Sequence, residues 1–124
     1  MKRIILSFIC VSFLFFSCSE KKKKKPSYKV AQSSVEKGKT LFNSNACSTC
    51  HHEQVKLIGP SIKDIAVKYK IDKGNIVSFL QGKSKAIVDL NPGQIAMMKA
   101  NLSSTESMKI KKLKAISEYI MSIE

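Results

Sequence analysis

The sequence has 124 residues and a formal net charge of +13, and 44% of its residues are hydrophobic. A chain of this length has room for one small domain, which excludes a multidomain enzyme. The charge does not determine the fold, but it favours partners with acidic surfaces.

The first residues have the pattern of an export signal. Lys2 and Arg3 precede an apolar run of 13 residues, Ile4–Phe16. Such a run suits a signal peptide and falls short of the roughly 20 residues that a membrane-spanning helix needs. It ends in Phe-Phe-Ser-Cys, which resembles a bacterial lipobox with Phe15 in place of the more usual Leu or Val. The resemblance implies cleavage of residues 1–17 and lipid on Cys18; an ordinary signal peptide and an uncleaved anchor are the alternatives.

A lysine-rich segment follows. Lys21–Lys25 are consecutive lysines, which repel one another and stay solvated, so we expect residues 18–30 to be a tether. The lysines would also attract anionic lipid headgroups. An exported chain does not meet nucleic acid, and we expect none as a partner. Residues 26–124 retain 15 basic and 8 acidic side chains, so the folded part remains basic.

Residues 31–124 are expected to form one all-α domain, because helix signals recur and no stretch alternates with period two. Ser33-Ser34-Val35-Glu36 is a capping box and predicts the start of the first helix. Val35, Gly38 and Phe42 then share one face of this helix. Glycine is less favourable than alanine inside a helix, so we expect another backbone to approach Gly38 closely.

Two short helices are expected next. Ser61 and Asp64 predict the cap of one, and Asp72 predicts the start of the other, which stops near Gly82. Their apolar residues at helical spacing are Ile62, Ile65, Ala66, Tyr69, Ile76, Val77, Phe79 and Leu80. Asn91-Pro92-Gly93 then predicts a turn.

The last helix has the clearest pattern. Ser103-Ser104-Thr105-Glu106 contains a capping box, and apolar residues follow it at spacings of three and four. These residues are Ile110, Leu113, Ile116, Ile120 and Ile123.

Cys47-Ser48-Thr49-Cys50-His51 has the Cys-x-x-Cys-His spacing of a haem-attachment signature. Two thiols can add to the two vinyl groups of haem and form thioether bonds. The two intervening residues make about one helical turn, which spans the gap between the vinyl groups. His51 is then brought under the iron and can serve as its proximal ligand. One covalent haem c is therefore the predicted cofactor.

Three other uses of these residues compete with haem. A thioredoxin-type redox pair expects a βαβ context, which no pattern here predicts. A disulfide between Cys47 and Cys50 would close a very small, strained loop. A zinc site would need His51 and its neighbour His52 to converge on one ion, which adjacent residues can hardly do. We expect His52 to be an exposed polar residue.

From Val35 to Ile62 the sequence reads VEKGKTLFNSNACSTCHHEQVKLIGPSI. This stretch resembles the opening of class I cytochromes c of the small monohaem bacterial type. The resemblance implies about four to five short helices wrapped around one covalently attached haem. It also implies that Gly38 packs against an aromatic residue of the last helix, for which Tyr119 is the candidate. Finally, it implies that the carbonyl group of Pro60 accepts the Nδ1–H of His51.

The resemblance further implies a methionine as second axial ligand, located between the turn and the last helix. Met97 and Met98 lie in that region, whereas Met108 and Met121 are expected in the last helix. Met98-Lys99-Ala100-Asn101 resembles the corresponding segment of the family, in which a proline usually follows the methionine. Met98 is therefore the predicted distal ligand and Met97 the second choice. The residues expected to surround the porphyrin are Leu57, Ile58, Ile62, Ile65, Phe79, Leu80, Ile87, Val88, Leu90 and Ile95.

These expectations describe a monomeric single-electron carrier, lipid-anchored in the bacterial cell envelope and facing the periplasm, and not an enzyme. With both axial positions filled, no coordination position remains for a substrate. Lys56, Lys63 and Lys99 are candidates to steer the haem edge toward a membrane-associated reductase or oxidase with an acidic surface. One alternative is a haem enzyme or ligand sensor with an open sixth coordination site. Another is a membrane-surface or metal-binding lipoprotein without haem.

Overall fold

The computed structural model describes residues 28–124, with side chains from Ser33 onward. This part contains six α-helices, one 3-10 turn and no strand, which confirms the all-α fold and adds helices to the number expected. The elements are α1 (Tyr28–Ser44), η1 (Cys47–Thr49), α2 (Ile62–Ile71), α3 (Ile76–Leu80), α4 (Pro92–Asn101), α5 (Ser103–Glu106) and α6 (Ile110–Met121). Within residues 28–124 no helix is long and apolar enough to cross a membrane. The predicted signal peptide, Cys18 and the lysine run lie outside the described residues.

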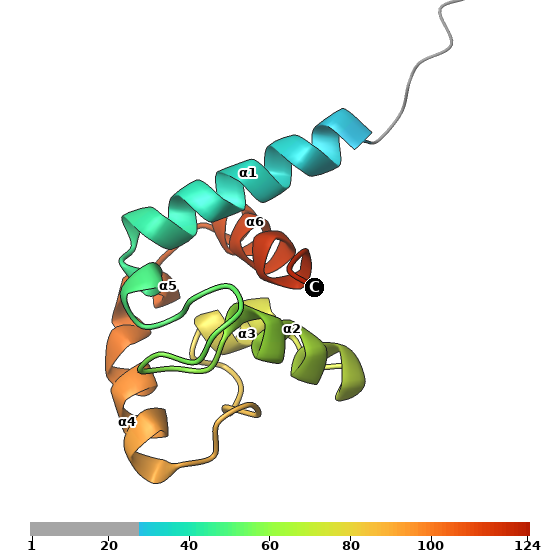
Figure 1. Ribbon diagram of the computed structural model, residues 1–124. Helices are drawn as coiled ribbons and strands as arrows, with labels where there is room; N and C mark the ends of the chain where they lie inside the picture. The colour runs from blue at the N-terminus through green and yellow to red at the C-terminus, as the bar shows by residue number, and fades with distance from the viewer. Residues whose placement is uncertain (1–27) are drawn as a thin grey trace, which may run out of the picture.

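Helices α1 and α6 lie across one another at Gly38 (Figure 1). A Cβ atom at Gly38 would collide with the backbone carbonyl of Ala115 and would lie 2.8 Å from Cβ of Tyr119. Next to this point the rings of Phe42 and Tyr119 pack edge to face, with their centroids 5.4 Å apart. The close approach at Gly38 and its aromatic neighbour Tyr119 are thus both as expected. Only a residue without a side chain lets the two helices come so near.

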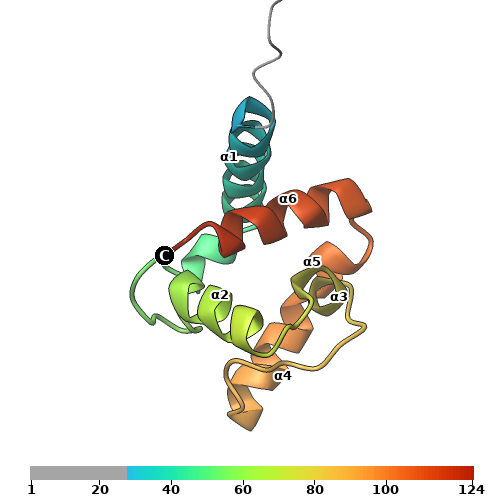
Figure 2. The ribbon, with the colours of Figure 1, turned by 90° about the vertical axis from the view of Figure 1, so that its right-hand side faces the viewer.

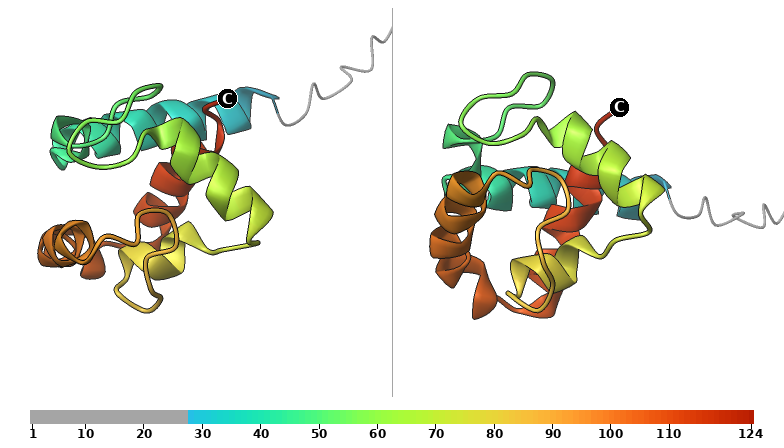
Figure 3. Two further views of the ribbon diagram at one scale, coloured as in Figure 1. Left: turned by 60° about the horizontal axis from the view of Figure 1, so that its bottom comes forward. Right: turned by 90° about the horizontal axis from the view of Figure 1, so that it is seen from below.

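Helix α6 lies between α1 on one side and α2, α3 and α4 on the other (Figure 2). Its buried side chains are Leu113, Ala115, Ile116, Tyr119 and Ile120. Seen from below, α6 lies between α4 on one side and α2 on the other (right-hand view of Figure 3). The apolar stripe read from the sequence of α6 therefore packs against α1 and also against α2 and α3.

The start of α2 was predicted correctly, and the start of α3 was not. The Ser61 hydroxyl accepts the Asp64 N–H at 3.0 Å and caps α2. Asp72 ends this helix, because its N–H still donates to the carbonyl of Lys68. Lys73 then adopts a left-handed φ of 51°, which breaks the helix. Helix α3 starts instead after Asn75, whose side chain accepts the Ser78 N–H at 3.0 Å.

The capping boxes expected for the first and last helices do not mark their starts. Helix α1 begins at Tyr28, so Ser33 lies inside it. No Gly or Pro stands between the two residues to break a helix, and α1 reaches into the segment expected to be the tether. Residues 103–106 form the separate helix α5, and α6 begins at Ile110. Thr105 is buried and its hydroxyl donates to the carbonyl of Leu80 at 2.7 Å.

The turn expected at Asn91-Pro92-Gly93 is the start of helix α4, which was not predicted. The Asn91 side chain accepts the N–H of Gly93 at 2.9 Å and that of Gln94 at 3.3 Å. Pro92 occupies the first turn, where its missing N–H has no consequence. Turn chemistry and helix-start chemistry use the same residue types here. Met108 lies between α5 and α6 and not in the last helix as expected, whereas Met121 is in α6.

Replacing Gly38 by Ala is expected to lower the free energy of unfolding by at least about 2 kcal/mol, because overpacking against a backbone outweighs the gain in helix propensity. Urea unfolding followed by circular dichroism measures the change. Gly93→Ala in α4 is the matched control, since its Cβ would meet a single side-chain atom, Oδ1 of Asn91 at 3.2 Å, and no backbone. We expect that control to stay within about 1 kcal/mol of wild type. Equal stability of the two variants would contradict the close crossing.

Candidate functional site

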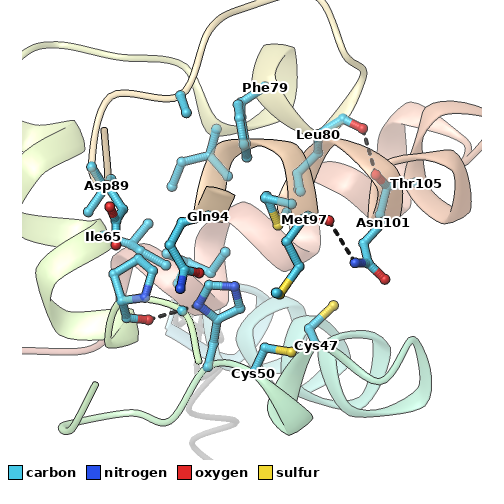
Figure 4. A pocket seen from close by; sticks show the side chains of 18 of the residues that line it. Cys47, Cys50, Ile65, Phe79, Leu80, Asp89, Gln94, Met97, Asn101 and Thr105 are labelled. Atoms are coloured by element: carbon cyan, nitrogen blue, oxygen red, sulfur yellow. Dashed lines mark hydrogen bonds between the residues drawn. The ribbon is translucent and has the colours of Figure 1, made fainter. Parts of the chain in front are cut away.

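An apolar cavity opens between α2, α3, α4, α6 and the segment that follows α1. Its lining includes both thiols, the imidazole of His51, and the side chains of Met97 and Met98. Figure 4 shows Cys47 and Cys50 on one side of this cavity, with the thioether of Met97 extending toward them from α4. The chemistry-bearing residues picked from the sequence are thus brought to one place.

Cys47 and Cys50 are held by the 3-10 turn η1. The carbonyl oxygen of Cys47 accepts two N–H groups, that of Cys50 at 3.2 Å and that of His51 at 3.0 Å. Ala46, with a left-handed φ of 56°, reverses the chain between α1 and this turn. The tight turn therefore presents both thiols and the imidazole to the same cavity.

The structure argues against the three competing uses of the motif. Both cysteines are free thiols, so they form no disulfide with each other. Burial raises the pKa of the Cys47 thiol, which is opposite to what a nucleophilic redox thiol needs. Among the residues that the structure describes, no group of three or more His, Cys, Asp or Glu side chains could hold a metal ion.

The imidazole of His51 is oriented by a hydrogen bond from its Nδ1 to the carbonyl oxygen of Pro60, at 2.8 Å. A carbonyl oxygen can only accept, so Nδ1 carries the hydrogen and Nε2 keeps its lone pair. The hydrogen bond implied by the family resemblance is therefore present. This hydrogen bond leaves the lone pair of Nε2 available to coordinate a metal.

Gly59 is a site residue for which no role was predicted from the sequence. A Cβ atom there would collide with the His51 ring, lying 2.9 Å from Nδ1 and 3.0 Å from Nε2. The Gly59 N–H also donates to the carbonyl of Cys50 at 2.9 Å. Glycine at this position therefore lets the loop close directly over the imidazole. A glycine at a fixed distance after the motif is the only signal that could have indicated this role.

Most of the apolar residues expected around a porphyrin do line the cavity. Those that do are Ile58, Ile65, Phe79, Leu80, Ile87, Val88 and Ile95. Leu57 and Leu90 are largely exposed, and Ile62 is buried in the core outside the lining. Apolar lining residues that were not expected are Phe42, Tyr69, Ile76, Ile116 and Ile120. All five were assigned to helix faces, because a periodic pattern does not distinguish packing on a helix from packing on a cofactor.

The two candidate distal methionines differ in exposure. Met98 is half-buried and packs against the hydrophobic core, whereas Met97 is 47% exposed. Asn101 Nδ2 donates to the backbone carbonyl of Met97 at 2.8 Å. Met108 and Met121 also pack against the core, but they are not part of the lining. Both methionines chosen from the sequence therefore reach the cavity, and the other two do not.

Some polar residues around the motif are simply exposed, whereas others form ion pairs or hydrogen bonds with distant parts of the chain. His52 is exposed, as expected, and its Nδ1 accepts the Gln54 N–H at 3.2 Å. Lys63 and Lys99 are exposed. Lys56 is exposed too, but its ammonium group pairs with the carboxylate of Asp89 at 3.1 Å. Its charge is therefore partly neutralised.

Glu53 is a further residue that the sequence analysis did not single out. Its Oε1 accepts hydrogen bonds from Lys39 Nζ and Tyr119 Oη, each at 3.0 Å. These hydrogen bonds lower the pKa of the Glu53 carboxyl group. Burial and the same carboxylate raise the pKa of the Tyr119 hydroxyl to about 12. A single oxygen thus links the segment after His51 to α1 and α6.

Comparison with known proteins agrees with this site. The family model for cytochrome c matches residues 35–124. Cytochrome c-552 of Nitrosomonas europaea is 34% identical over 85 residues, which cover 68% of this chain and 76% of the relative. Cytochrome c-551 of Azotobacter vinelandii is 34% identical over 86 residues, covering 69% of this chain and 96% of the relative. Cytochrome c-551 of Pseudomonas denitrificans is 31% identical over 87 residues, covering 70% and 98%.

The chain belongs to the cytochrome c family. More particularly, it is a small class I c-type cytochrome, and its cofactor is covalently bound haem c, whose attachment motif Cys47 and Cys50 fit. The relatives support the role of a monohaem electron carrier. The cavity suits such a group, because two free thiols, a free imidazole nitrogen and an apolar lining meet in it.

Gly59→Ala is expected to break the Nδ1 hydrogen bond of His51, because the added methyl group displaces the imidazole. We expect the haem-loaded variant to lose at least about 2 kcal/mol of unfolding free energy, measured by guanidinium unfolding followed through the Soret band. Pro60→Ala is the control, since it keeps the accepting backbone carbonyl. A Gly59→Ala protein as stable as Pro60→Ala would show that the loop does not need to close over the ring.

Proposed function

We propose that the protein carries single electrons between membrane-associated redox partners, with His51 and Met98 as the axial ligands of its haem iron. The observation that carries this proposal is the orientation of His51. Its Nδ1 is engaged by Pro60 at 2.8 Å, and its Nε2 is left for iron in the cavity that also holds the two thiols. Haem supplies an iron that cycles between two oxidation states and takes or gives one electron.

In this proposal Cys47 and Cys50 hold the haem by two thioether bonds. The spacing fixed by η1 supports that assignment, because both sulfur atoms and the imidazole come from one tight turn. Free thiols are the form that can add to vinyl groups, and both are free. A covalent link at two points prevents loss of the cofactor from so small a domain.

The distal ligand proposed is Met98, with Met97 as the second choice. Met98 is the more shielded of the two, and a thioether away from water suits a soft, neutral ligand that raises the reduction potential. The resemblance of Met98-Lys99-Ala100-Asn101 to the family segment supports the same choice. Met97 also extends into the cavity (Figure 4), so variants must decide between the two residues.

The apolar lining excludes water from the iron and, together with a thioether ligand, favours a positive potential. No protein side chain then needs to take part in bond making or breaking. Lys63 and Lys99 would steer the carrier toward acidic surfaces of a reductase or an oxidase. Lys56 contributes less to this steering, because its charge is paired with Asp89.

The chain is further proposed to be exported and tethered in the cell envelope, facing the periplasm. Residues 1–17 would be the signal peptide, Cys18 the lipid attachment site and residues 18–30 the tether. Support comes from the apolar run before Cys18 and from the lysines after it. Tethering raises the effective concentration of the carrier near membrane-bound partners.

A haem protein with an open sixth position is the rival from another functional class. The two thioethers that reach the cavity argue against it, because either can close that position. Spectra distinguish the two functions. A high-spin oxidised spectrum and ready carbon monoxide binding would support the rival.

Spectra of wild type, Met97→Ala and Met98→Ala test the proposal. We expect the oxidised wild type to be low-spin with a weak far-red methionine-to-iron band. Met98→Ala should lose this band completely and Met97→Ala should keep it. The opposite result would reassign the ligand to Met97, and a band in neither the wild type nor the variants would exclude methionine ligation. Intact mass of the detergent-extracted wild type should show one covalent haem and acyl chains on Cys18.

A Cys47→Ala/Cys50→Ala double variant is expected to fold poorly, because the cavity is then left without the group that fills it. A domain this small buries a limited core and depends on its cofactor for stability. Urea unfolding followed by circular dichroism should show little cooperativity. Ser48→Ala, which alters the same turn and keeps both thiols, is the control. A cooperative transition like that of wild type in the double variant would contradict this view.

A further inference from the structure

The imidazole of His51 is part of a closed circuit of contacts. The rings of His51 and Phe42 meet edge to face, with centroids 6.5 Å apart and planes at 63°. The rings of Phe42 and Tyr119 meet in the same way at 5.4 Å and 66°. The Tyr119 hydroxyl then donates to Glu53, which stands two residues after His51 in the chain. The circuit thus returns along the backbone to the residue where it began.

The carboxylate of Glu53 holds this circuit in place through two hydrogen bonds. Its Oε1 accepts Tyr119 Oη and Lys39 Nζ, each at 3.0 Å. Lys39 also lies over the Tyr119 ring, 5.9 Å from its centroid. Tyr119 is 4% exposed, so its ring has little freedom of its own. The three side chains come from α1, α6 and the loop, and together they hold the loop against the crossing of the two helices.

The backbone of the same segment is held as well. The carbonyl of His52 accepts the Ile62 N–H at 2.9 Å, and that of Glu53 accepts the Lys63 N–H at 3.0 Å. Residues 52 and 53 are therefore fixed to α2, while the Glu53 side chain reaches α1 and α6. Pro60 holds the Nδ1 edge of the imidazole, and Phe42 lies against the ring.

We propose that Glu53 and Tyr119 are positioning residues that fix the rotation of the His51 ring about its bond to iron. Glu53 anchors Tyr119, Tyr119 holds Phe42, and Phe42 limits the angle that the imidazole plane can take. This inference rests on the proposed role of His51 as axial ligand. Outer contacts of this kind orient the ligands of metal sites in general.

Proton NMR of the oxidised, haem-loaded protein tests the inference, because the shifts of the four haem methyl groups depend on the orientation of the axial imidazole plane. Tyr119→Phe keeps the ring and removes the hydroxyl, and Glu53→Ala removes the acceptor. We expect both to change the spread and order of the methyl shifts. Glu53→Gln retains an acceptor oxygen and should stay close to wild type.

Asp72→Ala is the matched control, since it also removes a carboxylate that pairs with a lysine, Lys68 at 2.8 Å, but at the exposed C-terminal end of α2. It should leave the methyl shifts unchanged. Wild-type shifts in both Tyr119→Phe and Glu53→Ala, even with reduced stability, would overturn the inference and leave the proposed function intact. A wild type without a low-spin, histidine-ligated spectrum would overturn the proposed function itself. If Glu53→Ala does not fold, the comparison of the haem methyl shifts of Tyr119→Phe with those of Glu53→Gln decides.

Discussion

The hydrogen bond from His51 Nδ1 to the Pro60 carbonyl is the interaction on which the rest of the site depends. It sets the tautomer, so that Nε2 would offer a metal a lone pair and not a hydrogen. It also requires the loop to return over the ring, which is why Gly59 has no room for a side chain. Ser61, the next residue after Pro60, caps α2 at once. One backbone carbonyl thus joins the cofactor motif to the start of the following helix.

The fold supports this loop through the crossing of α1 and α6. Gly38 brings the two helices together, and Phe42 and Tyr119 fill the space beside the contact. Phe42 also faces the His51 ring, so the interface that joins the two ends of the domain forms a wall of the cofactor cavity. Stability and function share the same side chains here. In a domain with so small a core, few residues can serve only one purpose.

Features that depend on residues close together in the chain could be predicted from the sequence. The cap of α2 is one such feature, because an N-cap hydroxyl accepts the N–H of the residue three positions further on. Here the hydroxyl is that of Ser61 and the N–H is that of Asp64. The thiols and His51 are brought together by one turn, which does not depend on how the rest of the chain packs. Predictions of features that depend on tertiary contacts were missing or wrong. Thr105 looked like part of a capping box, but its hydroxyl is used by the carbonyl of Leu80 on another helix. Asn91 caps a helix where a turn was expected, because both structures begin with the same residues.

The same reasoning explains why Glu53 escaped notice. A charged residue after a motif is usually a solvated side chain, and its partners, Lys39 and Tyr119, lie 14 and 66 residues away in the chain. No local pattern connects three such positions. Yet the carboxylate lies where the loop, α1 and α6 meet, and its two hydrogen bonds join both helices to the segment of His51, the proposed axial ligand. With His51 as the proposed axial ligand, covalent attachment fixes where the haem lies, but it does not fix how the imidazole turns beneath it. We propose that contacts around the ring set this angle, and the circuit through Phe42, Tyr119 and Glu53 supplies such contacts from elements that the attachment motif does not contain.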